Sequence, residues 1–338
     1  MRRALLLLVV ALAVASAPMR AQGGKPLEIH FIDVEGGQAT LFVLPGGQSM
    51  LVDTGFPGLN GRDADRIAAA AKRAGLSRID TVVVTHYHAD HVGGVPALAS
   101  RIPIGTFVDH GPTVESGEQP AALYAAYVDA RAKGRHVLAR PGEAMRVGDL
   151  AITFVSAGGD LITKPLAGAG AANPLCEGYT AKAADATENA RSVGMLLTYG
   201  RFRMLDLGDL TWNKEHDLVC PANLLGTVDV YLTTHHGLDQ SGLPALVHAV
   251  HPRVAIMNNG ARKGGSVEAW TAVRSSPGLE DLWQLHYAVS SDAQHNAPEP
   301  FIANMDETTA HEITIAAQRD GSFVVTNARN SHTKTYKK

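Results

Sequence analysis

Cysteine is scarce in this chain of 338 residues, which contains only Cys176 and Cys220. Neither lies in the histidine-rich segment described below, so a structural metal site built from thiolates is not indicated. Both follow an N-terminal segment typical of exported proteins, and an oxidising compartment would permit a disulfide between them. The sequence leaves two alternatives open, one intramolecular disulfide or two buried thiols.

The chain also lacks an excess of basic residues. Lysine and arginine total 30 against 33 aspartates and glutamates, for a net charge of −3 and an isoelectric point near 6.6. Such a balance provides no overall positive field to attract nucleic acid, although a local basic groove would be compatible with it. We therefore find no strong nucleic-acid-binding signature.

Long hydrophobic runs are absent beyond the N-terminus, where no segment reaches the roughly 18 apolar residues needed to span a membrane. The chain starts with Met1, Arg2 and Arg3, followed by an apolar stretch at 4–17 that ends in small residues. This layout is typical of a secretory signal peptide, with cleavage after residue 17 or 21. We predict a signal peptide at 1–21 and an exported protein, periplasmic or secreted, with no membrane span after signal removal. An uncleaved N-terminal anchor is the alternative.

Histidine is concentrated in one short segment. Residues 85–94 read Thr-His-Tyr-His-Ala-Asp-His-Val-Gly-Gly and directly follow an apolar stretch at 79–84. Residues two apart in an extended segment point the same way, so His86 and His88 can converge on one metal ion. The glycines that follow favour a turn, which lets Asp90 and His91 face a second ion. These donors predict one or two Zn²⁺ ions, with Mn²⁺ or Fe as alternatives.

Strand and helix patterns alternate along the rest of the chain, which indicates a single large α/β domain at 22–338. Residues 157–190 show no such period and predict a long loop insertion, either a functional lid or a tolerated surface insertion. The expected strands lie at 28–34, 38–44, 48–52, 81–84, 104–108, 144–155 (a pair of strands), 193–199, 202–207, 228–233, 253–257, 282–288, 312–317 and 323–327, and the expected helices at 61–74, 95–100, 120–133, 243–251 and 266–275.

Further metal-ligand types stand at the ends of two later strands. Asp209 closes the sequence Leu-Asp-Leu-Gly-Asp at 205–209, and His235 and His236 follow the next strand. Asp209 is a candidate carboxylate bridging two ions, with a helix N-cap as the alternative. One of the two histidines is expected to be a ligand and the other to contact a ligand or the substrate. Position directly after the strand slightly favours His235 as the ligand.

Taken in order, these motifs resemble those of the metallo-β-lactamase superfamily, and most of all the soluble metallo-hydrolase domain of bacterial DNA-uptake channel (competence) proteins. The matching segments are 29–33 with 36–39, 51–55, 86–91, 208–209 and 235–237, so the resemblance covers nearly all of 22–338. It implies an α/β fold, a four-layer αβ/βα sandwich with the metal site at one edge between two sheets. It also implies that Asp53 orients ligands rather than binding metal.

The chain departs from this family at one place. The family usually has another histidine about twenty residues before the bridging aspartate, where this chain reads Thr-Glu-Asn-Ala-Arg-Ser at 187–192. The resemblance therefore implies a first site of His86 and His88 with only Asp209, whereas Asp90, His91, Asp209 and His235 complete a second site. The spacing Asn-x-x-Ser is typical of the DNA-uptake branch. His110 is a candidate substitute ligand, with a structural role in its loop as the alternative.

These residues predict an exported metal-dependent hydrolase that uses a metal-activated hydroxide, with Asp90 and Asp209 as catalytic residues. Candidates for steadying the developing oxyanion are His236, Asn189, Arg191 and His295. Branch resemblance favours phosphodiester substrates. A lactone, β-lactam or other small ester is the alternative substrate, and a non-catalytic metal-binding module is the alternative class. Nothing in the sequence indicates an oligomeric state.

Overall fold

The described part of the chain runs from residue 24 to residue 338 of a computed structural model. The predicted signal peptide at 1–21 lies outside the described residues. Among the helices of residues 24–338, none combines the length and the apolar character that crossing a membrane requires.

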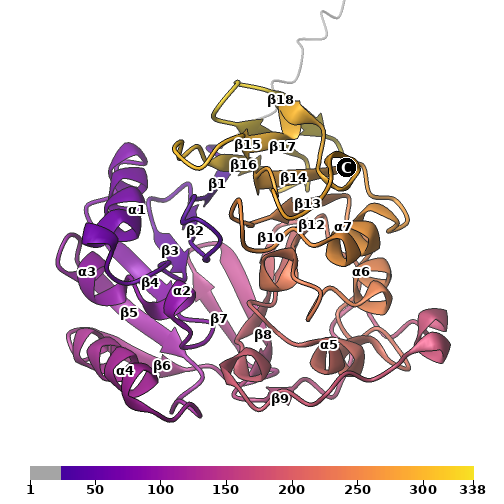
Figure 1. The fold of residues 1–338 in the computed structure, drawn as a ribbon, viewed down its shortest axis with the longest axis horizontal. Helices are drawn as coiled ribbons and strands as arrows, with labels where there is room; N and C mark the ends of the chain where they lie inside the picture. Colours follow the sequence, from indigo (N-terminus) through magenta and orange to yellow (C-terminus); the bar gives the residue numbers. More distant parts are fainter. Residues whose placement is uncertain (1–23) are drawn as a thin grey trace, which may run out of the picture.

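Two sheets form the centre of the molecule (Figure 1). The first sheet contains, in spatial order, β18 (Thr333–Tyr336), β17 (Phe323–Asn327), β16 (Ile313–Ala317), β1 (Leu27–Phe31), β2 (Thr40–Val43), β3 (Ser49–Val52), β4 (Ile79–Val83), β5 (Ile104–Asp109) and β6 (Arg135–Leu138). The second contains β15 (Ile302–Asn304), β14 (Asp281–His286), β13 (Val254–Met257), β12 (Val230–Leu232), β11 (Phe202–Asp206), β10 (Gly194–Tyr199), β8 (Leu150–Ala157) and β7 (Ala144–Val147), with β9 (Asp160–Leu161) paired to β8.

Helices cover the outer face of each sheet (Figure 1). The first sheet is covered by α1 (Arg62–Arg73), α3 (Val95–Ala99) and α4 (Glu118–Arg131), and the short α2 (Ala89–Val92) precedes α3. The second is covered by α5 (Trp212–Val219), α6 (Pro244–Val250) and α7 (Val267–Arg274). The arrangement is the four-layer αβ/βα sandwich, so the predicted fold class is confirmed.

Side chains from both sheets form one shared core between them. Phe31 of the first sheet and Phe154 and Trp283 of the second are all buried in it. Strands such as β16 and β17 alternate buried and partly exposed residues, because one face meets the other sheet. Trp283 satisfies its indole N–H in this apolar layer by donating to the hydroxyl of Tyr336 at 3.0 Å.

The sequence did not indicate several edge elements. The edge strands β6 and β18 are only four residues long, and polar residues make up half of β6 and most of β18 (Thr-Lys-Thr-Tyr at 333–336), so their patterns are weak. Helix α5 also went unpredicted, and it follows the turn at 208–209 directly.

The segment between β8 and β10 is irregular apart from β9 and two 3₁₀ turns, η2 (Pro174–Gly178) and η3 (Glu188–Arg191). Cys176 in η2 is joined by a disulfide to Cys220, which follows α5. The structure thereby selects the disulfide from the two alternatives that the sequence left open. The disulfide therefore links this long loop to the end of α5, in the helical layer that covers the second sheet.

Candidate metal centre

The ends of parallel strands bring the predicted site residues to one edge of the sandwich. Strands β3, β4 and β5 run parallel in the first sheet, and β11, β12 and β13 run parallel in the second. Their carboxyl ends are followed by Asp53, the 85–91 segment, Asp209 and the His235–His236 pair. Crevices outside the carboxyl ends of such strands are where α/β proteins bind ligands.

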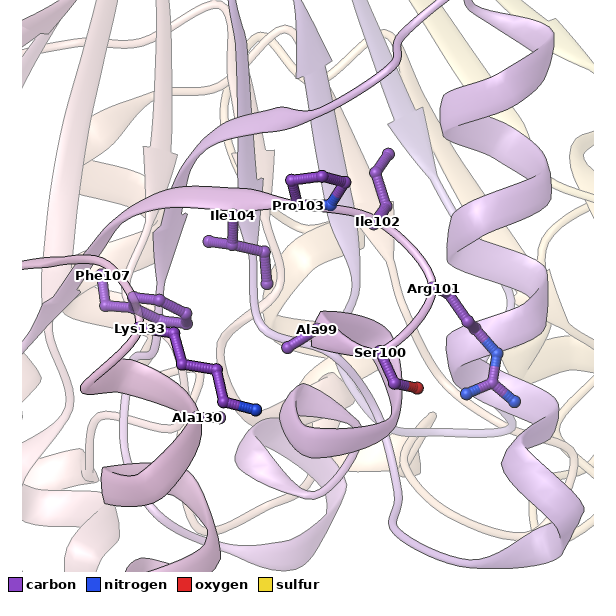
Figure 2. A pocket seen from close by; sticks show the side chains of 9 residues that line it. All are labelled: Ala99, Ser100, Arg101, Ile102, Pro103, Ile104, Phe107, Ala130 and Lys133. Carbon is purple, nitrogen blue, oxygen red and sulfur yellow. The ribbon is translucent and has the colours of Figure 1, made fainter.

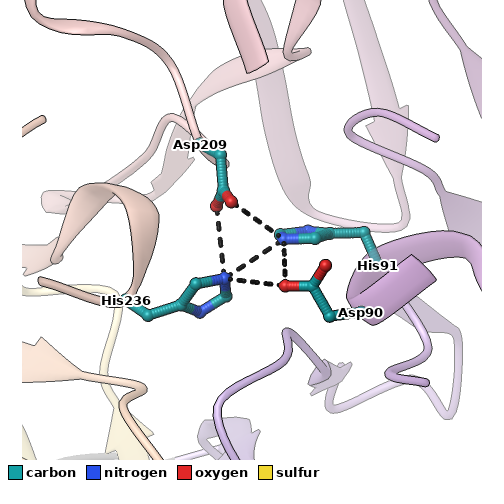
Figure 3. Close-up of side chains that lie close together, drawn as sticks. All are labelled: Asp90, His91, Asp209 and His236. Atoms are coloured by element: carbon teal, nitrogen blue, oxygen red, sulfur yellow. Dashed lines mark hydrogen bonds and ion pairs between the residues drawn. The ribbon is translucent and has the colours of Figure 1, made fainter. Parts of the chain in front are cut away.

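Four buried side chains converge at this edge: Asp90, His91, Asp209 and His236 (Figure 3). Each offers one ligand atom, and these atoms all lie within 4.8 Å of one another. Nε2 of His91 is 3.2 Å from Oδ2 of Asp209 and 3.3 Å from Oδ2 of Asp90. Nε2 of His236 is 3.3 Å from that Asp90 oxygen and 3.4 Å from Oδ1 of Asp209. Two imidazoles and two carboxylates suit zinc, manganese or iron.

The geometry favours His236 over His235 as the histidine of this group, the reverse of the preference drawn from the sequence. Both residues have left-handed backbone conformations, with φ of 55° and 56°, in the 3₁₀ turn η4 (Thr234–Gly237). The chain therefore turns sharply after β12 instead of continuing extended, and this turn aims the second histidine at Asp90. Nε2 of His235 still lies 3.3 Å from Oδ2 of Asp209.

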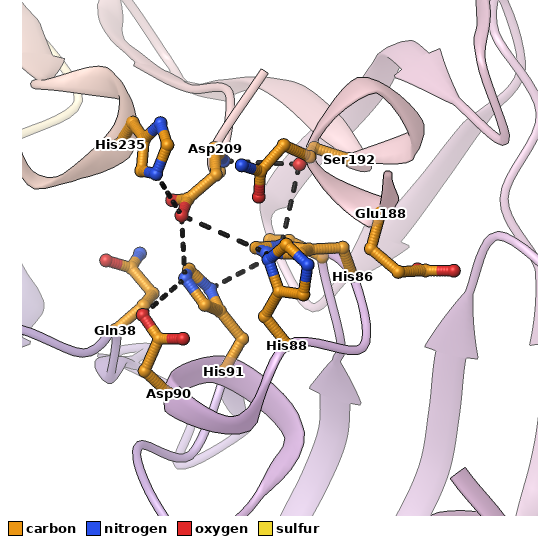
Figure 4. A network of polar contacts seen from close by, with 12 residues as sticks. Gln38, His86, His88, Asp90, His91, Glu188, Ser192, Asp209 and His235 are labelled. Atoms are coloured by element: carbon orange, nitrogen blue, oxygen red, sulfur yellow. Dashed lines mark hydrogen bonds and ion pairs between the residues drawn. The ribbon is translucent and has the colours of Figure 1, made fainter. Parts of the chain in front are cut away.

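His86 and His88 form a second pair beside His91 and Asp209 (Figure 4). Nε2 of His86 is 3.1 Å from Nδ1 of His88 and 3.9 Å from Oδ2 of Asp209. His86 is fully buried, and burial together with the neighbouring His91 lowers its pKa well below the ordinary value. A neutral imidazole is the form that binds a metal. This geometry allows Asp209 to face both groups.

Polar partners hold the ligand side chains in place. Nδ1 of His91 is 2.8 Å from Oδ2 of Asp53. The Thr85 hydroxyl donates to the same oxygen, and the Thr85 backbone N–H donates to Oδ1. Nδ1 of His236 lies 3.2 Å from the side-chain amide of Asn258, which also contacts Gln38. Such partners fix the ring orientation of metal-binding histidines. Asp53 thus occupies the orienting position that the resemblance implied.

The group carries negative charge that is compensated by its neighbours. Burial would raise the pKa of Asp209, but the adjacent His91, His236 and His235 hold it well below the usual carboxyl value. Asp90 behaves in the same way, with its pKa lowered by His91, His236 and Lys263. The Lys263 ammonium contacts Oδ2 of Asp90 directly. Lys263 was not predicted, because it stands in a loop after β13 with no motif around it.

Residues 187–192, where the family resemblance implied a further histidine, pack against the candidate metal ligands. Ser192 accepts a hydrogen bond from the backbone N–H of Asp209 at 3.2 Å, and its hydroxyl is 3.5 Å from Nδ1 of His86. Asn189, three residues earlier in η3, is 7% exposed, and its amide oxygen has no hydrogen-bond partner among the described residues. Arg191 turns away and donates to the carbonyl of Gly158 at 2.7 Å, so it is not available to a phosphate in this arrangement.

Two other predicted histidines do not join the group. Nε2 of His110 is 2.8 Å from the carboxylate of Glu188, which also accepts hydrogen bonds from Tyr87 N–H and Thr113. His110 therefore takes the structural alternative, not the role of substitute ligand. His295 lies in the turn η5 (Ala293–His295), where it contacts Asp292 and the ring of Trp270 instead of the ligand group.

Two surface hollows lie at different distances from this centre. One, shown in Figure 2, is lined by Ala99, Ser100, Arg101, Ile102, Pro103, Ile104, Phe107, Ala130 and Lys133. It sits around the start of β5, the opposite end of that strand from the ligand group, and we assign it no role. The other includes His88 in its wall.

A ligand group of this composition, at the edge between the sheets of an αβ/βα sandwich, defines the metallo-β-lactamase fold. Residues 32–172 match the sequence model of the Metallo-beta-lactamase superfamily, and this region contains the 85–91 segment. The match supports the superfamily that the motifs indicated.

Individual relatives show more distant similarity. A hydroxyacylglutathione hydrolase of Stenotrophomonas maltophilia is 36% identical over 104 residues, which cover 28% of this chain and 34% of the relative. A metal-dependent hydrolase of Anaeromyxobacter dehalogenans is 26% identical over 225 residues, which cover 65% of this chain and 71% of the relative. The chain thus matches about a third of the first relative's length. The metallo-beta-lactamase fold protein YhfI from Bacillus subtilis is 12% identical to this chain, with a TM-score of 0.46. The match covers 77% of this chain and 96% of the YhfI chain.

Proposed function

We propose that the protein is an exported metal-dependent hydrolase that acts on phosphodiester-type substrates. The observation that carries the proposal is the convergence of Asp90, His91, Asp209 and His236. All four are buried, and each contacts a further polar group that holds it in place. A metal ion held there, Zn²⁺ by donor type, supplies Lewis acidity and lowers the pKa of water towards neutrality.

The surrounding residues support substrate binding and proton transfer. Asp90 and Asp209 stay ionised, so their carboxylates can bind a metal ion and can accept a hydrogen bond that orients an attacking water. Lys263 is the cation that touches this group, and its ammonium can pair with an anionic phosphoryl oxygen. In this proposal Lys263 replaces Arg191, which the sequence offered as a candidate for steadying the developing oxyanion. Resemblance of the Asn-x-x-Ser segment to the DNA-uptake branch also supports a phosphodiester.

Export is proposed on two grounds. The first is the signal-like layout of residues 1–21, and the second is the Cys176–Cys220 disulfide, which suits an oxidising compartment.

Elemental analysis combined with a small substrate panel tests the function. The purified protein should contain stoichiometric divalent metal and should hydrolyse a chromogenic phosphodiester faster than a lactone or a cephalosporin. Asp209→Asn should abolish turnover while circular dichroism shows a retained fold. Faster hydrolysis of the lactone or cephalosporin would move the assignment to the alternative of a lactone, β-lactam or small-ester hydrolase. Absence of metal and of turnover with any added divalent ion would favour the non-catalytic module.

A further inference from the structure

A hollow opens directly beside the candidate metal centre, on the His88 side. Its wall combines residues from the ligand segment with the loop after β3 and the start of α4: Pro57, Tyr87, His88, Ala89, Glu115, Gln119, Pro120 and Leu123. The His88 side chain is 31% exposed, and its Nδ1 lies 3.1 Å from Nε2 of the buried His86, so the hollow adjoins the His86–His88 pair. A molecule reacting at the metal centre would therefore have this hollow within reach of one of its substituents.

The walls of the hollow are mostly apolar, and their one charged group is negative. Glu115 is that group, and its carboxylate is 3.1 Å from Nε2 of His88. No lysine or arginine lines the hollow. An anionic substituent would meet this carboxylate with no lysine or arginine in the wall to compensate the repulsion, at a cost in free energy.

The apolar part of the wall comes from Pro57, Ala89, Pro120 and Leu123. A concave, mostly apolar wall with few polar groups is typical of a ligand-binding site. Lys263, by contrast, provides positive charge at Asp90.

We propose that this hollow, which we call the Leu123 pocket, binds an uncharged alkyl or aryl arm of the substrate while its anionic reacting group lies at the metal centre. The inference rests on the proposed function and narrows it. The substrate class is a phosphoester with an apolar arm. A polynucleotide is disfavoured, because its next phosphate would approach Glu115.

Alkylphosphonates provide the test, since each has one anionic head and one arm. Binding of methyl-, butyl- and hexylphosphonate to the metal-loaded protein is measured by calorimetry, together with 5-carboxypentylphosphonate as a charged-arm control. Affinity should rise about fourfold for each methylene that enters the pocket. The carboxylate-ended arm should lose most of the gain shown by hexylphosphonate.

Two variants locate the effect. Leu123→Trp should fill the pocket and bring the ratio of hexyl- to methylphosphonate affinity close to one. Ala122→Trp, an exposed neighbour on α4 that is outside the pocket wall, should keep the full ratio. Leu123→Lys should reverse the preference in favour of the carboxylate-ended arm, and it keeps the test usable if the tryptophan variant does not fold.

The outcomes separate this inference from the proposed function. If none of the phosphonates binds and no phosphodiester is hydrolysed, the proposed function fails. If all the phosphonates bind with equal affinity, or if Leu123→Trp retains the length dependence, the apolar-arm inference is overturned while the hydrolase assignment stands.

Discussion

Removing the charge of Asp53 should weaken metal binding without removing a ligand. The Asp53 carboxylate is fully buried and faces three donors: Thr85 N–H at 2.8 Å, the Thr85 hydroxyl at 2.7 Å and Nδ1 of His91 at 2.8 Å. Asp53→Asn leaves one oxygen for this set, so at least one donor loses its acceptor. Asparagine is the best replacement for the backbone, because φ at position 53 is 58° and asparagine tolerates this left-handed region.

The expected size of the effect follows from the contact to His91. Without a carboxylate at Nδ1, the proton of the imidazole is free to move to Nε2, the atom that faces Asp90 and Asp209. Loss of such a partner typically weakens metal affinity 10- to 100-fold, or about 1.4–2.8 kcal/mol. The buried donor left unpaired should also lower the free energy of unfolding by about 1–3 kcal/mol.

Competition with a chromogenic zinc chelator measures the affinity, and thermal unfolding of the metal-free protein measures the stability. Asp109→Asn is a matched control, because Asp109 is equally buried and is bonded to Tyr127 and Arg131 but contacts no ligand. The control should lose stability and keep its zinc affinity. Zinc affinity within twofold of wild type in Asp53→Asn would refute the orienting role.

Three further predictions concern separate parts of the molecule. Burial raises the pKa of Glu215 to about 7 from its ordinary 4.5, so folding favours its protonated form; stability should fall by about 3 kcal/mol as the pH rises from 4.5 to 7. Urea unfolding of Glu215→Gln, which stays neutral, should lack this part of the decline, and an unchanged pH profile would argue against it. Cys220→Ser opens a disulfide whose cysteines are 44 residues apart and should cost about 4 kcal/mol; equal melting temperatures for variant and wild type would contradict this. Lys263→Met should raise KM for a phosphodiester about tenfold with a smaller change in kcat, whereas an unaltered KM would remove Lys263 from substrate binding.

The strands and the ligand segment could be predicted because their signals are local. Alternation and β-branched runs mark β1 to β4, and His86, His88, Asp90 and His91 fall within six positions. Asp209 was also within reach, since it stands directly after a strand. The helices α1, α3, α4, α6 and α7 followed from the spacing of apolar residues between strands, whereas α5 did not.

The remaining parts of the site depend on backbone conformation or on tertiary contacts. Two consecutive left-handed residues decide between His235 and His236, and no composition rule predicts them. Lys263 reaches Asp90 across 173 positions, and Glu188 meets His110 across 78. Such pairs are fixed by packing of distant loops, so a single sequence carries no sign of them. The contact of Glu188 with His110 in particular could not be predicted, because a carboxylate in a loop is ordinarily solvated.

Metal content per chain tests the central claim most directly. Elemental analysis of the wild-type protein and of His236→Ala, after equal incubation with Zn²⁺ and gel filtration, compares the intact ligand group with one that lacks an imidazole. We expect at least one zinc per wild-type chain and a marked loss of zinc in His236→Ala. Wild-type protein without stoichiometric zinc, or a variant that retains all of it, would contradict the assignment of this group as a metal centre.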